Sequence, residues 1–387
     1  MSEKLNQTHI VLIPKIQGPE TLGNYRPISL CNTTYKIVTK ILVARLRPYL
    51  GNLISPLQSA FVLGRKGIDN AIIVQELIHT ISKKNGKVGY MAIKIDLEKA
   101  QLIEEKCHNK LWSPVKVSRS GPAFSHLMFA DDLVLFVKVD SSNCSIIRDV
   151  LDEFCAVSGQ TISDSKSKVY FSPNVDQDSR ESLSDILGFV STSNLGKYLG
   201  IPIKHPNSSS QEFNFILDRV KGKLVGWKAN LLSLAGRAVL VQSSTSTIPS
   251  YAMQCSYLPD RILQGVDRVN RNFLWGSTDT VKKMHWVGWH KVTKPKSEGG
   301  LGLQTAKGRN VSLLAKLNWQ LHTEGESSWA QVLRAKYCNA QRLQSRNVRN
   351  LPCSRVWSAV KKGADTFNKG IKWVVGRNSN LRFWFDH

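Results

Sequence analysis

Apolar residues in the first hundred positions follow two periods, one typical of strands and one typical of helices. Short apolar runs predict a strand at 8–16 and, within 90–100, a buried strand that turns into a helix at Asp96. Apolar positions at helical spacing, with Lys and Arg between them, predict a helix at 33–50. A second helix is expected at 70–83, with Asp69 as its cap. Strands and helices mixed in this way indicate an α+β fold.

The clearest single pattern lies at 126–139, where two apolar arms flank Asp131-Asp132. Apolar residues on both sides of a two-residue acidic centre predict a β-hairpin with these aspartates at its tip. A helix is expected at 144–158, and another short strand at 197–203.

The pattern changes after about residue 210. Residues 213–232 and 236–244 have helical spacing with basic polar faces, and nine of the ten Trp lie beyond residue 200. Linkers are expected at 206–211 and 276–281. Trp among Lys and Arg can stack on nucleic-acid bases, or it can form the core of a helical domain. The pattern leaves both interpretations open.

Composition narrows the class of protein. Of the 387 residues, 42% are apolar, which excludes a disordered polar tail and allows two or three compact units. No uncharged apolar run approaches the ~20 residues that cross a bilayer, so we expect no membrane partner. The seven Cys are scattered without C-x-x-C spacing, which indicates reduced thiols of a cytosolic or nuclear protein and no zinc site.

Charge is unevenly distributed along a strongly basic chain. The formal net charge is +24, yet residues 101–200 hold 10 basic and 13 acidic residues. A basic molecule with one acidic segment suits a binder of polyanions that also holds divalent cations. A basic protein with no role on nucleic acid is the alternative.

The candidate chemistry is carried by Asp96 and Asp131-Asp132. Phosphoryl transfer to a hydroxyl uses two divalent ions about 3.5–4 Å apart, and hard cations such as Mg²⁺ prefer carboxylate oxygens. An aspartate at the end of a buried strand, facing another at the tip of a neighbouring hairpin, would supply them. The alternative is that Asp131-Asp132 only forms the turn and stays solvated.

These motifs resemble those of a known family. FADD (129–132) and IDLEKA (95–100) resemble the catalytic motifs of reverse transcriptases, and NYRPISL (24–30) begins a stretch that resembles the fingers of LINE-type, non-LTR retrotransposon reverse transcriptases. The further segments that resemble this family, the last two its plant members, are 53–79, 158–172, 197–203, 226–253 and 285–303. The resemblance implies a right-hand polymerase, with fingers and palm at 1–205, a thumb-like helical region at 206–275 and a Trp-rich basic extension at 276–387.

The resemblance also implies roles for individual residues near the nucleotide. Asp96 and Asp131 resemble the metal ligands, and Asp132 resembles a secondary ligand or orienting group. Arg26 resembles the fingers arginine that pairs with the incoming triphosphate, and Lys166 resembles a lysine near the pyrophosphate that acts as a general acid. Arg26 in a surface salt bridge and Lys166 as an exposed loop residue are the alternatives.

Four more residues resemble contacts to the template and primer. Gln58 and Arg65 resemble template-side residues, although either could be a solvated loop residue. Tyr198 and Gly200 resemble the primer grip, where glycine lets the backbone approach the strand.

The sequence departs from this family after Ala100. Gln101-Leu102-Ile103 stand where an aromatic residue and a second aspartate are expected, and only 35 positions separate Asp96 from Asp131. The family places a much longer stretch there, including a palm helix and a Gly-Gln-Gly-x-Pro-Leu-Ser-Pro loop that seats the template and nucleotide. We therefore expect an internal deletion between about residues 100 and 102. The expected endonuclease and zinc module are also missing from the two ends, so we expect a chain truncated at both.

The function that the resemblance implies is RNA-directed DNA polymerisation, impaired by the deletion. The expected partners are an RNA template, a DNA primer and deoxynucleoside triphosphates, with two Mg²⁺ ions if the chain is active. A catalytically inactive remnant that binds nucleic acid is the first alternative. A metal-dependent nuclease using the same carboxylates is the second. Family habit suggests a nuclear or cytoplasmic location.

Overall fold

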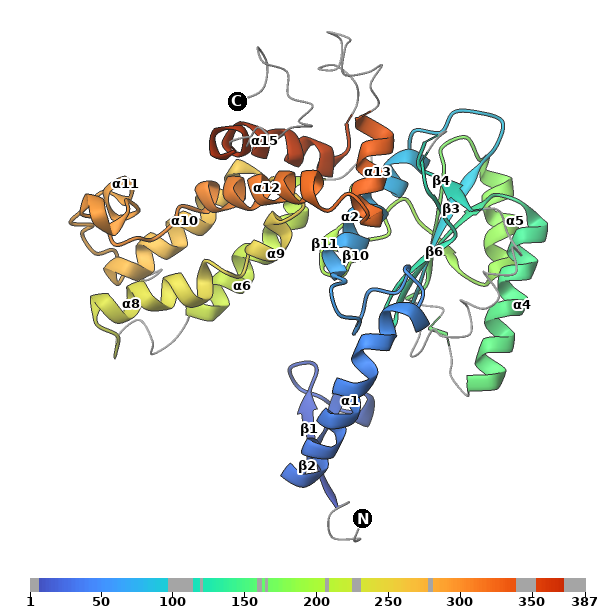
Figure 1. Ribbon diagram of the computed structural model, residues 1–387, viewed down its shortest axis with the longest axis horizontal. Helices are drawn as coiled ribbons and strands as arrows, with labels where there is room; N and C mark the ends of the chain where they lie inside the picture. The colour runs from blue at the N-terminus through green and yellow to red at the C-terminus, as the bar shows by residue number, and fades with distance from the viewer. Residues whose placement is uncertain are drawn as a thin grey trace, which may run out of the picture. The chain divides into compact units, whose positions relative to one another are not determined.

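A computed structural model describes residues 7–96, 114–118, 121–158, 162–163, 166–205, 209–224, 231–277, 281–338 and 353–371. Its chain divides into two compact units, residues 1–65 and 66–387 (Figure 1). The predicted divisions near residues 205 and 275 lie inside the second unit. The boundary at Arg65–Lys66 was not predicted.

The first unit is a hairpin followed by one helix. Strand β1 (Thr8–Pro14) pairs antiparallel with β2 (Tyr25–Cys31), and helix α1 (Thr33–Leu53) follows. Asn32 caps α1 by accepting a hydrogen bond from the amide of Tyr35 at 2.9 Å. The predicted strand and helix of this region are confirmed.

The apolar face of α1 lies on the surface of this unit. All of α1 is described, and each of its residues is exposed or half-buried. We call its apolar face the α1 stripe; its members are 49–73% exposed and comprise Ile37, Ile41, Leu42, Val43, Leu46, Tyr49 and Leu53. The apolar pattern predicts the helix correctly, but the apolar side chains of α1 are not buried within residues 7–65.

The second unit contains a five-stranded sheet of order β6-β7-β3-β8-β9. Its strands are β3 (Tyr90–Asp96), β6 (His126–Phe129), β7 (Asp132–Lys138), β8 (Lys168–Phe171) and β9 (Val190–Ser191). All neighbours are antiparallel except β8 and β9. The predicted hairpin at 126–139 is confirmed, but its two-residue turn is Ala130-Asp131 and Asp132 already belongs to β7. The strand predicted from residue 90 ends at Asp96 as expected, and residues 97–100, where the helix is expected to begin, lie outside the described part.

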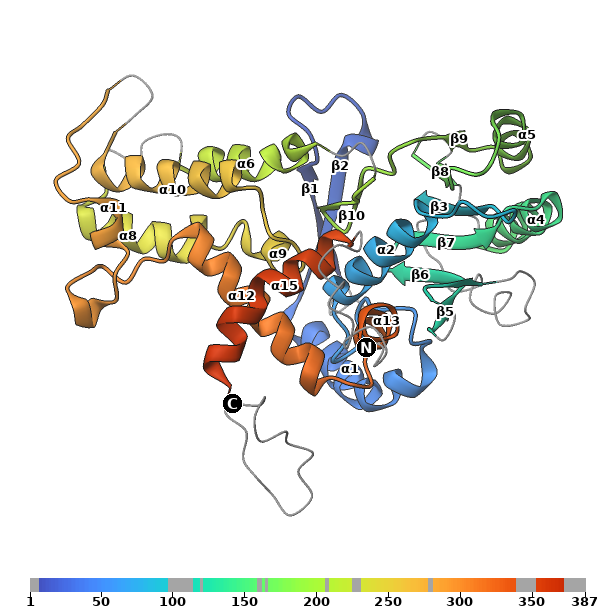
Figure 2. The same ribbon diagram turned by 90° about the horizontal axis from the view of Figure 1, so that it is seen from above.

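Helices cover both faces of this sheet. Helices α4 (Ser141–Ser158) and α5 (Gln177–Leu187) lie on one face, and α2 (Gly67–Ile81) lies on the other (Figure 2). Alternation along β3 explains this arrangement, because Met91 and Ile93 join the core with α4 and α5 while Ala92 points to the other side.

Helix α2 starts earlier than the sequence predicts. Its first residue is Gly67, and Asp69 lies in the first turn instead of capping it, because the Asp69 amide already donates to the carbonyl of Lys66 at 3.0 Å. Gly67 permits a close approach: a Cβ there would lie 2.8 Å from a ring carbon of Phe129. The start of α2 therefore packs closely against the end of β6.

The rest of the second unit is mainly helical. Its helices are α6 (Asn214–Leu224), α8 (Leu234–Leu240), α9 (Ser250–Met253), α10 (Asp260–Trp275), α11 (Trp289–Val292), α12 (Ala306–Thr323), α13 (Ser328–Tyr337) and α15 (Arg355–Gly370). Two short hairpins, β4 (Val115–Lys116) with β5 (Ala123–Phe124) and β10 (Lys197–Tyr198) with β11 (Ile201–Pro202), complete it. Within the described ranges, every helix is too short or too polar to cross a membrane.

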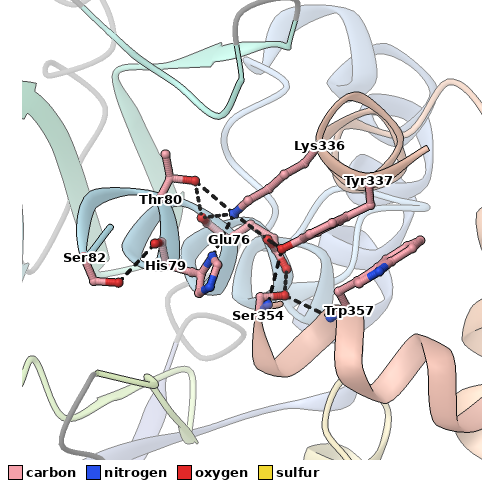
Figure 3. Close-up of polar contacts among 8 residues, drawn as sticks. All are labelled: Glu76, His79, Thr80, Ser82, Lys336, Tyr337, Ser354 and Trp357. Atoms are coloured by element: carbon pink, nitrogen blue, oxygen red, sulfur yellow. Dashed lines mark hydrogen bonds and ion pairs between the residues drawn. The ribbon is translucent and has the colours of Figure 1, made fainter. Parts of the chain in front are cut away.

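A buried polar cluster attaches the carboxy-terminal helices to α2. The carboxylate of Glu76, 0% exposed, receives the Nζ of Lys336 from α13 at 2.8 Å and the hydroxyl of Tyr337 at 2.9 Å (Figure 3). The hydroxyl of Ser354, which caps α15, donates to the same carboxylate. The predicted extension after residue 275 therefore contacts the predicted palm directly.

Candidate active site

Strand pairing brings the three predicted metal ligands to one end of the sheet. In the β3–β7 pair, Asp96 stands opposite Asp132. In the β6–β7 hairpin, Phe129 stands opposite Asp132, so Ala130 and Asp131 form a two-residue turn. Facing Cα atoms in antiparallel strands lie about 4.5–5.5 Å apart. Asp96 is therefore one residue out of register with Asp131 and directly across from Asp132.

The turn that carries Asp131 is strained. Ala130 has a φ of 54°, in the left-handed region that residues with a Cβ rarely adopt. Such a conformation costs about 1–3 kcal/mol and persists only where the surrounding structure holds it. The Asp131 side chain is exposed at this turn, while Asp132 is half-buried. The hairpin therefore presents one carboxylate to solvent and keeps the next beside β3.

Helix α2 holds the β6–β7 hairpin through a side-chain hydrogen bond. Asn70, 3% exposed, donates from Nδ2 to the carbonyl of Met128 at 2.8 Å, two residues before the turn. Motif reasoning did not select Asn70. The available signal was a polar residue on the buried face of an otherwise apolar helix, where a polar group needs a partner.

Lys166 belongs to the same end of the sheet. Strand β8 pairs with β3 on the side away from β7, with Lys168 opposite Lys94. The pairing ends at Lys168, and Lys166 lies two residues before β8, at the end of the sheet toward which β3 runs to Asp96. Lys166 is exposed, and its amide donates to the carbonyl of Ser163 at 3.1 Å in the turn before β8.

The predicted primer grip is a tight hairpin. Leu199 and Gly200, with φ of 48° and 78°, form the two-residue turn between β10 and β11. Gly200 is exposed, but Tyr198 is only 1% exposed. Burial raises the pKa of the Tyr198 hydroxyl well above its usual value, and the nearby Asp132 carboxylate raises that pKa further. Tyr198 is therefore a protonated core residue, and only Gly200 is open to a strand.

Gln75 of α2 fixes this hairpin. The side chain is 4% exposed, donates from Nε2 to the carbonyl of Pro202 at 2.7 Å, and accepts from the amide of Lys204 at 3.1 Å. One helix therefore supplies Asn70 to the Asp131 hairpin and Gln75 to the Gly200 hairpin, which sets the position of both.

The remaining predicted contacts lie in the first unit. Arg26 is exposed on β2, opposite Ile13 of β1. Gln58 is half-buried, and its Oε1 accepts from the amide of Ala60 at 3.1 Å. Their roles toward triphosphate and template stay predictions.

Arg65 has a structural use that the sequence did not predict. Its guanidinium donates to four backbone carbonyls at the end of α1 and in the turn after it, those of Gly51, Ile54, Ser55 and Gln58. Carbonyls at the last turn of a helix lack intrahelical partners and favour a positive charge. The side chain therefore closes α1, and its template role stays a prediction.

The donor set suits a hard cation. Among the side chains that are described, which exclude that of Asp96, three or more His, Cys, Asp or Glu nowhere gather as a metal site. Asp131 and Asp132 beside the backbone of Asp96 nevertheless offer carboxylate oxygens alone, which is the ligand type that Mg²⁺ prefers.

Parts of this chain are similar in sequence to known proteins. Residues 13–101 match the family described as reverse transcriptase (RNA-dependent DNA polymerase). The transposon TX1 uncharacterized 149 kDa protein of Xenopus laevis is 24% identical over 423 residues, covering 89% of this chain and 30% of that protein. The chain is thus similar to reverse transcriptases over residues 13–101 and to a transposon protein over most of its length.

Two similar proteins come from a plant. A putative ribonuclease H protein of Arabidopsis thaliana is 37% identical over 188 residues, which cover 48% of this chain and 30% of that protein. An uncharacterized mitochondrial protein of the same organism is 26% identical over 140 residues, covering 36% of this chain and 90% of that protein. The chain thus spans about a third of the length of the ribonuclease H and TX1 proteins.

Proposed function

We propose that this chain carries the nucleotidyl-transfer centre of an RNA-directed DNA polymerase of a non-LTR retrotransposon. Asp96 and Asp131, with Asp132 beside them, would hold two Mg²⁺ ions. The observation that supports this most strongly is the β3–β7 register, which sets Asp96 across from Asp132 at the strained turn. A solvated turn alone would not require a second aspartate opposite it.

Each residue has a distinct task in this proposal. Bound Mg²⁺ would lower the pKa of the primer hydroxyl and neutralise charge on the triphosphate. The Arg26 guanidinium would bind triphosphate oxygens through its paired donors. Lys166, in the turn before β8, would donate a proton to the departing pyrophosphate. The Gly200 turn would bring backbone close to the primer, opposite an RNA template.

We further propose that an internal deletion impairs this centre. The family match ends at residue 101, five positions after Asp96. The TX1 alignment runs over 423 positions, whereas 89% of this chain is about 344 residues, so about 80 aligned positions lack a residue here. Loss of groups that orient substrates can remove about 7–11 kcal/mol of barrier lowering. Incorporation by this chain would then be slow.

The second candidate is a remnant that binds nucleic acid without catalysis. The missing stretch favours it, because binding through a net charge of +24 needs no complete nucleotide pocket. The two candidates share the fold and differ only in turnover.

Primer extension separates them. The intact chain is incubated with poly(rA), oligo(dT), thymidine triphosphate and Mg²⁺, beside Asp131→Ala and the control Asp149→Ala, an exposed aspartate on α4. Incorporation that is lost in Asp131→Ala and kept in Asp149→Ala supports the polymerase. Absent incorporation with salt-sensitive binding supports the remnant. Incorporation that Asp131→Ala leaves unchanged contradicts the assigned site.

A further inference from the structure

The structure separates exposed Trp from packed Trp in the basic carboxy-terminal half. Trp329 is 1% exposed and belongs to the core, and the ring of Trp357 is stacked on Tyr337. Trp286 and Trp319 are instead 78% and 54% exposed. Trp286 and Trp319 could therefore contact a ligand without any change in the fold.

Trp286 lies in a surface segment that is held at both ends. Residues 281–288, which we call the Trp286 segment, are exposed throughout. Before this segment, helix α10 ends at Trp275, and the described chain runs on to Ser277. After it, α11 returns to the core, where Val292 is 4% exposed. The segment is therefore a bridge across the surface between two packed helices.

Two contacts fix which way the Trp286 segment faces. The His285 ring lies over the Trp275 ring, with centroids 6.3 Å apart and planes 23° apart. The Lys283 amide donates to the Ser277 hydroxyl at 3.0 Å. The residues that alternate with these, Met284 and Trp286, are 70% and 78% exposed. The contacts of Lys283 and His285 therefore hold the backbone next to an exposed apolar pair.

The charge around this pair is positive. Residues 281–300 contain five Lys and one acidic residue, Glu298, which already pairs with Lys294 at 3.6 Å. Lys282 and Lys283 adjoin Met284 and are exposed. Arg237 of α8 lies against Gly276, where its guanidinium would contact an added Cβ. The segment therefore joins an exposed aromatic ring to exposed cations close to it in the sequence.

We propose that the Trp286 segment binds single-stranded nucleic acid, with one base stacked on the Trp286 ring and backbone phosphates at Lys282 and Lys283. A polynucleotide repeats a flat base and an anion in each unit, which matches this alternation of ring and cation. A duplex keeps its bases paired and stacked, so an unpaired strand is the better fit. This inference deepens the proposed function by naming where the strand contacts the chain outside the aspartate centre.

Binding of labelled oligo(dT) and oligo(rU) to the intact chain tests it. Trp286→Ala should weaken binding about tenfold or more, because stacking on one aromatic contributes about 1–3 kcal/mol per base. Trp286→Phe should keep most of the affinity. Trp319→Ala, the matched change at the other exposed Trp, should leave it unchanged.

Salt dependence tests the phosphate contacts separately. Replacing both Lys282 and Lys283 by Ala should lower the slope of log affinity against log salt by about 1.4, since each phosphate contact to a single strand contributes about 0.7. Trp286→Ala should leave that slope unchanged, because stacking releases no counterion.

Several results would overturn the inference. One is equal binding by Trp286→Ala and the unaltered chain. Another is a hairpin duplex bound as tightly as the single strand with the same dependence on Trp286. A third is loss of binding to phosphatidylserine vesicles with no loss for oligonucleotides, which would assign the segment to a membrane surface. No nucleotide is added, so Asp131→Ala should bind normally, and failure of polymerisation remains distinguishable from failure of this site.

Discussion

Lys336 and Glu76 stand 260 positions apart in the sequence and form a buried ion pair with 2.8 Å between Nζ and Oε2. The same ammonium donates to the Thr80 hydroxyl at 2.9 Å and lies 3.2 Å from Nδ1 of His79 (Figure 3). The Lys336 ammonium of α13 thus contacts Glu76, His79 and Thr80 of α2. Because α2 also carries Asn70 and Gln75, the same helix connects the hairpins of the candidate site with the carboxy-terminal helices.

Breaking this pair should destabilise the second unit strongly. Glu76→Gln leaves the Lys336 ammonium buried without its counter-charge, and we expect the free energy of unfolding to fall by about 3 kcal/mol. Lys336→Met should cost a similar amount, and the double change less than the sum of the two. Chemical denaturation measures all three. The control is Glu298→Gln in the exposed pair with Lys294, which should change stability by less than about 1 kcal/mol; equal losses at both sites would contradict this account.

Helices α12 and α15 approach each other at Gly363. A Cβ at this position would collide with the carbonyl group of Leu314 and lie 2.7 Å from the amide nitrogen of Ala315. We expect Gly363→Ala to lower the free energy of unfolding by about 1–3 kcal/mol through overpacking. Gly370→Ala is the control in the same helix, since no atom lies within 4 Å of its added Cβ. Thermal melting should show a fall for the first only; a neutral Gly363→Ala would mean that the two helices separate readily.

Acid should weaken the fold through His205. This side chain is 3% exposed, and its Nε2 accepts from the Leu195 amide at 3.1 Å. Burial lowers its pKa from 6.5 to about 4. Between those pH values the unfolded chain binds a proton that the folded chain does not, so the free energy of unfolding falls as pH falls. We expect a loss of about 2 kcal/mol between pH 7 and pH 5 from this group.

Replacement of His205 by Gln tests that dependence, because glutamine can accept the same hydrogen bond without titrating. Denaturation at pH 7 and pH 5 should show a smaller difference for His205→Gln than for the unaltered chain. Part of the slope should remain, since burial also lowers the pKa of His79 to about 4. His9→Gln, an exposed change in the first unit, should leave the slope as it was. An unaltered slope in His205→Gln would contradict the assignment.

Asn70 should govern the stiffness of the Asp131 hairpin. Asn70→Ala leaves the buried Met128 carbonyl without its donor, which costs about 1–3 kcal/mol, and should speed hydrogen exchange at the start of β7. The control is Asn143→Ala, whose exposed amide donates to the Lys138 carbonyl at the other end of the same strand. Exchange near Asp132 that responds equally to both changes would show that α2 does not hold the turn.

Local patterns sufficed for the strands that carry the aspartates. Apolar arms around Asp131-Asp132 indicate a hairpin, but its turn is Ala130-Asp131, one residue before the predicted centre, so the pattern did not set the register. A buried strand ending at Asp96 then needs only to pair with one arm of that hairpin. These features depend on residues close together in the sequence, so their signal is strong.

Partners far apart in the sequence were not predictable. Glu76 in an apolar helix indicates a buried polar group, but nothing local says that Lys336 receives it. Tyr198 matched a motif for strand contact and yet lies in the core, because its exposure depends on how α2 and β10 pack. Asp69 looked like a cap, since the sequence does not show that Gly67 can pass beneath Phe129.

The α1 stripe has a consequence for the fate of the polypeptide in a cell. Chaperones and proteases act on chains that display apolar surface, and their action sets how much of a protein accumulates. A helix that shows solvent the side chains of Leu46, Tyr49 and Leu53 is such a target even while the second unit stays folded. We therefore expect quality control acting on the amino-terminal unit, and not the melting of the sheet, to determine the lifetime of this protein.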